Sequence, residues 1–165
     1  MSTPERTPGV DHALFRRVMG RFASGLTVIT AQVGSAVRGM TASAFMSGSL
    51  EPPLLVVSVA HRAHMHDHLI AAGRFAVNIL AEGQQDLANH FAGRLVESFD
   101  PEFVVVDGVP TLANACATMV ADVTATHACG DHTLFVGHIR SMAADDRAPL
   151  IYHAGRFTSL SGERA

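Results

Sequence analysis

The sequence lacks tryptophan, has few charges and cysteines, and contains no long apolar run. Only Cys116 and Cys129 are present, without a CxxC pair, which excludes a disulfide framework and a four-cysteine zinc site. Charged residues make up 16% of the 165 residues, and the net charge of −3 comes without a Lys/Arg cluster, so we expect no nucleic-acid partner. No segment approaches the roughly 20 apolar residues of a membrane span, and residues 1–10 lack the apolar core of a secretory signal. We therefore expect a cytoplasmic protein that does not bind membranes.

Familiar catalytic and phosphate-binding motifs are also missing. The chain has no GxxxxGK[ST] loop, no GxGxxG after a strand, no HExxH and no GxSxG. The common NTPase, dinucleotide-fold, metalloprotease and hydrolase classes therefore lack support. Any cofactor must be held in a different way.

The apolar pattern predicts short strands joined by tight turns. Residues 11–22 carry apolar side chains at helical spacing and predict an amphipathic helix. Strands are predicted at 26–33, 40–46, 54–59, 75–80, 113–123, 133–142, 150–152 and 157–160, and short helices at 64–72 and 84–91. The run 54–59 is continuously apolar, which predicts a central strand buried on both faces. A parallel sheet would need a helix at nearly every crossover, so we expect a mainly β, antiparallel barrel or sheet with few helices. It would be one domain over residues 11–165, after a flexible segment at 1–10.

The most informative segment covers residues 39–53. Small residues and hydroxyls alternate along a predicted strand and then meet Pro52 and Pro53, which leaves main-chain amides and hydroxyls open to a flat polar ring. This segment, followed by the stretches 54–60, 75–80 and 130–132, closely resembles the flavin reductases that serve two-component flavin monooxygenases. The resemblance runs from the first predicted helix to the last predicted strand.

This resemblance implies a fold, an activity and partners. The fold would be an FMN-binding split β-barrel, antiparallel and mainly β, with a few peripheral helices. The activity would be hydride transfer from NADH or NADPH to FMN or FAD, with the reduced flavin supplied to a separate oxygenase. The resemblance also implies a homodimer with flavin near the subunit interface. The choices between FMN and FAD and between NADH and NADPH stay open.

The resemblance also assigns flavin-binding residues by motif position. Five residues would line the isoalloxazine ring: Met40, Thr41, Ala42, Ser43 and Ala44. Three more would continue this wall: Ser58, Val59 and Ala60. The loop at 61–65, with His64 and Met65, falls where the family grips the ribityl phosphate, and His90 and Phe91 fall beside it. Many relatives have serine at the position of Ala63, so we expect His64 or Arg62 to supply that phosphate contact.

The nicotinamide side would be formed by residues near the end of the chain. His132 follows a Gly-Asp turn and is the candidate for orienting the nicotinamide, with Tyr152, His153 and Gly155 completing the site. Hydride transfer is performed by the flavin and nicotinamide themselves, so the protein needs to stack the two rings and stabilise the developing anion. This explains how a chain without a familiar catalytic dyad or triad could be an enzyme.

A histidine-rich stretch leaves one alternative open. His61, His64, His66 and His68 are close in sequence, and His64 and His68 would lie one helical turn apart, as metal ligands can. Asp67 would point to another face of the helix, so a histidine-rich surface helix is the simpler interpretation, and we predict no metal. Two further alternatives are an enzyme of the same fold that retains its flavin and reduces another acceptor, and a flavin-binding or flavin-sensing dimer.

Overall fold

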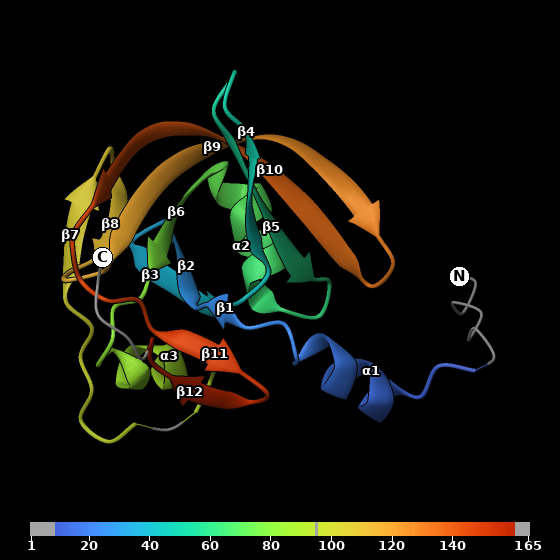
Figure 1. Cartoon of the computed structure of the whole chain (residues 1–165). Coiled ribbons are helices and arrows are strands. Elements are labelled where there is room, and N and C mark those ends of the chain that lie inside the picture. Colours follow the sequence, from blue (N-terminus) through green and yellow to red (C-terminus); the bar gives the residue numbers. More distant parts are fainter. Residues whose placement is uncertain (1–8, 95, 161–165) are drawn as a thin grey trace.

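Antiparallel strands curl into a barrel with one helix inside its opening and others at its margin (Figure 1). The computed structural model describes residues 9–94 and 96–160, so most of the expected flexible segment 1–10 lies outside the described residues. The helices are α1 (His12–Met19), α2 (His64–Ala72) and α3 (Gln85–Phe91). The strands are β1 (Ser24–Gly25), β2 (Thr27–Val33), β3 (Ala36–Ala42), β4 (Phe45–Ser49), β5 (Leu54–Ala60), β6 (Arg74–Ile79), β7 (Phe103–Val106), β8 (Val109–Leu112), β9 (Ala117–Cys129), β10 (His132–Ala144), β11 (Ile151–His153) and β12 (Arg156–Thr158). The expectation of a mainly β, antiparallel fold is confirmed.

The main sheet has the strand order β3-β2-β6-β9-β10-β5-β4, and all its pairs are antiparallel. Its inner face encloses a core that includes Ile29, Val57, Phe75 and Phe135, all fully buried. The prediction that strand 54–59 is central and buried on both faces is wrong. β5 lies next to the edge strand β4, and its residues alternate between buried and half-buried because only one face meets the core.

The sheet opens between β3 and β4, which are consecutive in the chain but lie at opposite edges. The Thr27 hydroxyl donates to the Ala42 carbonyl (2.7 Å) at the end of β3. Two residues later the Ala44 carbonyl accepts from the Ser58 amide of β5 (3.1 Å). The prediction of one strand over residues 40–46 is therefore wrong, because the chain changes its pairing partner at residues 43–44.

The helices occupy different positions around the barrel. α2 packs Met65 and Leu69 into the core and ends at Gly73, whose positive φ of 66° suits glycine. α1 begins at the capping residue Asp11 and extends away from the barrel, so none of its residues is buried (Figure 1). The β7–β8 hairpin is an addition to the strands predicted from the sequence. Within the described ranges, no helix is long and apolar enough to cross a membrane.

Candidate functional site

The end of β3 is held against α3 by two close contacts. The Thr41 hydroxyl donates to the Ala88 carbonyl at 2.7 Å. At Gly39 an added Cβ would come within 2.4 Å of two ring carbons of Phe91, so the ring occupies the space that any larger residue would need. The helix therefore approaches the strand more closely than a side chain at position 39 would allow.

A cavity of about 180 Å³ opens where β3, α3 and the β11–β12 hairpin meet. Its lining consists of Leu26, Thr41, Ala42, Ser43, Ala88, Asn89, Ala92, Arg94, Tyr152 and Phe157. Tyr152 and Phe157 are in ring contact (centroids 5.7 Å apart), and the Arg94 guanidinium donates to the Asn89 side-chain oxygen (3.1 Å). Aromatic rings, hydroxyls and an exposed cation together form a lining that fits a flat ring system with an anionic tail.

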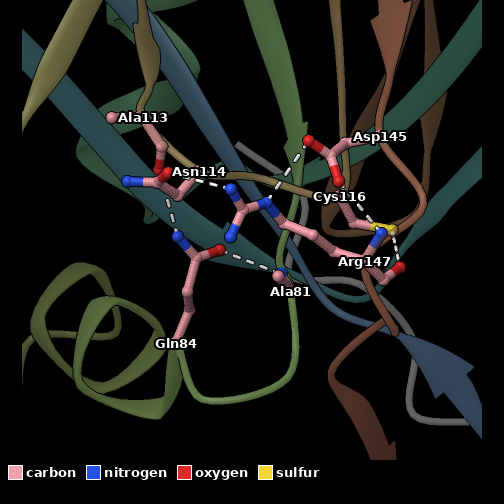
Figure 2. A network of polar contacts seen from close by, with 7 residues as sticks. All are labelled: Ala81, Gln84, Ala113, Asn114, Cys116, Asp145 and Arg147. Carbon is pink, nitrogen blue, oxygen red and sulfur yellow. Dashed lines mark hydrogen bonds and ion pairs between the residues drawn. The ribbon is translucent and has the colours of Figure 1, made fainter.

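A polar network fixes the loops behind α3 (Figure 2). The Gln84 side chain accepts from the Ala81 amide (2.9 Å) and donates to the Ala113 carbonyl (3.1 Å), just before α3 begins. Arg147 donates to the Asn114 side chain (3.1 Å) on the neighbouring loop. These bonds cross-link three loops and so determine where α3 presents its cavity-lining residues.

The second group of predicted flavin-binding residues lies on β5 and the loop after it, outside the cavity. Ser58 and Ala60 are half-buried on the outer face of β5, whereas Val59 is fully buried in the core. Val59 can therefore contribute only its main chain to the expected wall. Met65 is likewise in the core, at 3% exposure, so its side chain cannot reach a ligand on the loop, whereas His64 is exposed.

His132 begins β10 and lies opposite Ala60 of β5. Its Nδ1 lies 2.7 Å from Asp131 Oδ1, and this hydrogen bond lowers the pKa of Asp131 below its ordinary value. An ionised carboxylate only accepts, so Nδ1 carries the proton, and the Nε2 of neutral His132 remains free to accept from a ligand. Its side chain is 41% exposed and therefore accessible.

The structure brings some of the expected site residues together and separates others. Thr41, Ala42, Ser43 and Tyr152 all line the cavity between β3, α3 and the β11–β12 hairpin. His132 lies at the turn between β9 and β10, which is well apart from the β11–β12 hairpin that carries Tyr152, His153 and Gly155 (Figure 1). The four residues expected on the nicotinamide side thus do not form one cluster within a single chain.

The remaining candidates surround the cavity or support it. Met40 packs against the core, and Ala44 is exposed at the opening of the sheet. On α3, His90 is in ring contact with Phe91 (centroids 4.8 Å apart) and with Phe99 (5.3 Å). His90 and Phe91 thus support the helix beside the cavity rather than line it.

Six cavity residues were not predicted from the sequence, and three of them carry polar or aromatic side chains: Asn89, Arg94 and Phe157. Asn89 directly precedes His90, and Arg94 lies three residues after Phe91, so a cation just after a predicted helix was the available signal. The histidine-rich stretch does not gather metal ligands. In the described part of the chain, no three His, Cys, Asp or Glu side chains are grouped to hold a metal ion.

Comparison with known proteins assigns the family. Residues 19–161 match the flavin reductase like domain. An NADH-dependent flavin reductase from Rhodococcus sp. is 41% identical over 94% of this chain and 90% of its own length. The reductase component of 4-hydroxyphenylacetate 3-monooxygenase from Thermus thermophilus is 41% identical over 84% of this chain and 89% of its own length. The solved structure of flavin reductase PheA2 superimposes with a TM-score of 0.91 at 39% identity, covering 93% of this chain and all of that one. The expected resemblance is confirmed, and the chain belongs to the flavin reductase family.

Proposed function

We propose that this chain is an NADH-dependent flavin reductase that reduces FMN or FAD and supplies the reduced flavin to a separate oxygenase. The observation that carries the proposal is the cavity in which Thr41 and Ser43 of the flavin-binding motif meet the Tyr152 ring and the Arg94 cation. Family membership supports the reaction, and the relatives named as NADH-dependent favour NADH over NADPH.

In this proposal the residues of the chain bind and orient the flavin and the nicotinamide, and the flavin, when bound, supplies the hydride acceptor. Arg94 binds the anionic tail, and Tyr152 and Phe157 provide an apolar wall. The Thr41 hydroxyl already donates its hydrogen bond to the Ala88 carbonyl, so the Ser43 hydroxyl and main-chain amides are the donors that remain for the flavin ring. His132 accepts through Nε2 from the nicotinamide amide and so orients it.

We also propose a homodimer. Five large apolar residues of and just after α1 are exposed, although the helix is well capped: Leu14, Phe15, Val18, Met19 and Phe22. Met46 and Leu50, in and just after β4, are exposed as well. A second copy that covers these surfaces would remove apolar area from water and could bring its own residues near the separated parts of the site.

The cytoplasm is the proposed location, and residues 11–165 are proposed to act as one domain. Cys116 and Cys129 are both free, which fits a reducing compartment. Cytosolic NADH would then be available as the electron donor.

The decisive experiment is anaerobic. Purified protein is mixed with excess FMN or FAD, NADH or NADPH is added, and the absorbance of oxidised flavin is followed. Bleaching of many equivalents of flavin per protein is the expected result, and the four pairings identify both nucleotides. Tight flavin binding without bleaching in any pairing would contradict the proposal and favour a flavin-binding sensor. Bleaching of only one equivalent would favour an enzyme that retains its flavin.

A further inference from the structure

Two histidines converge on one threonine hydroxyl beside the β9–β10 turn. Thr133 Oγ1 lies 3.1 Å from His61 Nε2 and 2.9 Å from His66 Nε2. The two imidazole rings are in edge contact, with centroids 5.2 Å apart, and His66 also contacts the Phe135 ring. Thr133 is buried at 9% exposure, and the His66 side chain is 16% exposed. We call these three residues the His61–Thr133–His66 bracket.

The hydrogen bonds of the bracket have a defined direction. His66 Nδ1 contacts Asp67 Oδ1 (3.1 Å), and a carboxylate only accepts, so Nδ1 carries the proton of neutral His66. His66 Nε2 is then an acceptor, and the Thr133 hydroxyl uses its single proton to donate this hydrogen bond. His61 must therefore donate from Nε2 to the threonine oxygen, because that hydroxyl has no second proton to give.

The bracket connects three segments close to the turn that precedes His132. Thr133 belongs to β10, His66 to α2, and His61 to the loop that follows β5. The His61 amide also donates to the Asp131 carbonyl (3.0 Å), so this loop is tied twice to the β9–β10 turn. The bracket thus fixes the turn against the loop and the helix.

The bracket lies on the opposite side of β10 from His132. Neighbouring residues of a strand point to opposite faces, and here Thr133 is buried with Phe135 while His132 and Leu134 lie on the more exposed face. Hydrogen bonds to Thr133 therefore hold the strand from within, and they leave the outward His132 side chain free. A change at Thr133 reaches a ligand only through the position of His132 or of the loop.

We propose that the His61–Thr133–His66 bracket positions His132 for the nicotinamide, and that Thr133 is a positioning residue of the hydride-transfer reaction. The inference rests on the proposed reductase function and deepens it, because it names residues that determine NADH affinity without touching NADH. It also gives the histidine-rich stretch a role without a metal.

The test compares two substitutions at the same site. Thr133→Val keeps the shape of the side chain and removes the hydroxyl, whereas Thr133→Ser keeps the hydroxyl. With Thr133→Val we expect the KM for NADH to rise about five- to tenfold, as expected for losing a pair of hydrogen bonds, while the dissociation constant of flavin changes less than about twofold. Thr133→Ser should restore the KM to near the wild-type value. An unchanged KM in Thr133→Val would overturn the proposal, as would equal losses in both variants.

A double-mutant comparison separates positioning from general stability. If Thr133 acts through His132, adding Thr133→Val to His132→Ala should raise the KM for NADH by less than about twofold further. A purely structural role would produce the same further loss in both backgrounds and would contradict the proposal. The melting temperature of each variant is measured in parallel, so that unfolding is recognised.

A readout without turnover distinguishes failure of this inference from failure of the reductase function. In ¹⁵N-histidine NMR spectra of the wild-type protein at neutral pH, we expect His61 as the Nε2–H tautomer and His66 as the Nδ1–H tautomer. Thr133→Val should shift the His132 resonances, and Thr133→Ser should not. If wild-type protein reduces no flavin but shows these spectra, the bracket stands and the reductase function fails. If it reduces flavin while His132 is unaffected by Thr133→Val, the bracket fails alone.

Discussion

Phe91 lies directly over Gly39, so that a Cβ built on the glycine would come within 2.4 Å of two ring carbons. With the hydrogen bond from Thr41 to Ala88, this contact holds α3 to the end of β3 and closes one side of the cavity. The size of the residue at position 39 therefore controls the position of a helix that lines the site.

Substitution of Gly39 by alanine should displace α3. We expect Gly39→Ala to cost about 1–3 kcal/mol of unfolding free energy through overpacking and to weaken flavin binding, measured by urea unfolding and by quenching of flavin fluorescence. Gly25→Ala is the matched control, since its added Cβ would meet nothing within 4 Å and its φ is not positive. Unchanged flavin affinity in Gly39→Ala would show that α3 does not shape the site.

Arg94 should recognise the phosphate of the flavin. We expect Arg94→Ala to weaken FMN binding about tenfold, because a charge-assisted hydrogen bond is lost. Riboflavin, which lacks the phosphate, should bind both proteins equally well in the same titration. Arg62→Ala is the comparison variant, because Arg62 is the rival phosphate contact on the 61–65 loop. A tenfold loss with Arg62→Ala and none with Arg94→Ala would assign the phosphate to that loop.

His132 should contribute to nicotinamide binding. We expect His132→Ala to raise the KM for NADH by about tenfold through loss of a hydrogen bond and of ring contact, with flavin affinity unchanged. Steady-state kinetics with varied NADH measure the effect. His127→Ala changes an exposed histidine on the neighbouring strand β9 and should leave both constants at wild-type values. If KM and kcat are both unaffected in His132→Ala, the assigned role is wrong.

The Arg74–Asp122 ion pair should make stability depend on acid pH. Arg74 donates to both carboxylate oxygens of Asp122 (2.5 and 3.2 Å), and this hydrogen bonding lowers the pKa of Asp122. Because the pKa of Asp122 is lower in the folded than in the unfolded protein, the ion pair stabilises the folded protein at pH values above the unfolded-state pKa of about 3.9. This stabilisation is lost as the pH falls through the pKa of the folded state.

Asp122→Asn should therefore be less stable than wild type in urea at pH 7, and the difference should shrink at pH 3. Glu102→Gln is the control, since Glu102 is exposed and its side chain has no ion pair among residues 9–94 and 96–160. An Asp122→Asn deficit that is the same at both pH values would mean that the ion pair is not its source.

The exposed apolar face of α1 should form part of a dimer interface. Phe15→Glu places a charge on this face, and we expect it to shift the protein from dimer to monomer in sedimentation velocity. Arg17→Ala, on the polar face of the same helix, should leave the dimer intact. A monomeric wild-type protein would exclude the dimer, and a dimeric Phe15→Glu variant would place the interface elsewhere.

The sequence by itself determined the elements whose pattern is local. Helix α2 spans the predicted residues 64–72, because its apolar spacing and the glycine after it lie within one short segment. Apolar alternation and tight turns likewise predicted an antiparallel, mainly β chain. The motif at residues 39–53 was enough to indicate the family and to mark Thr41, Ala42 and Ser43, which the fold places in one cavity.

Only the tertiary structure decided which distant residues meet. The sequence of residues 40–46 predicts one strand, but the strand is interrupted at residues 43–44. The Ala42 carbonyl accepts from Thr27 of β2, whereas the Ala44 carbonyl accepts from Ser58 of β5. Arg94 reaches the cavity because α3 packs on β3, and Tyr152 separates from His132 because β11 pairs with β1 rather than with the main sheet. Thr133 meets its two histidine partners because β10 pairs with β5, which leads into the loop of His61 and the helix of His66. Such contacts depend on strand pairing and close packing across the barrel, which local periodicity does not record.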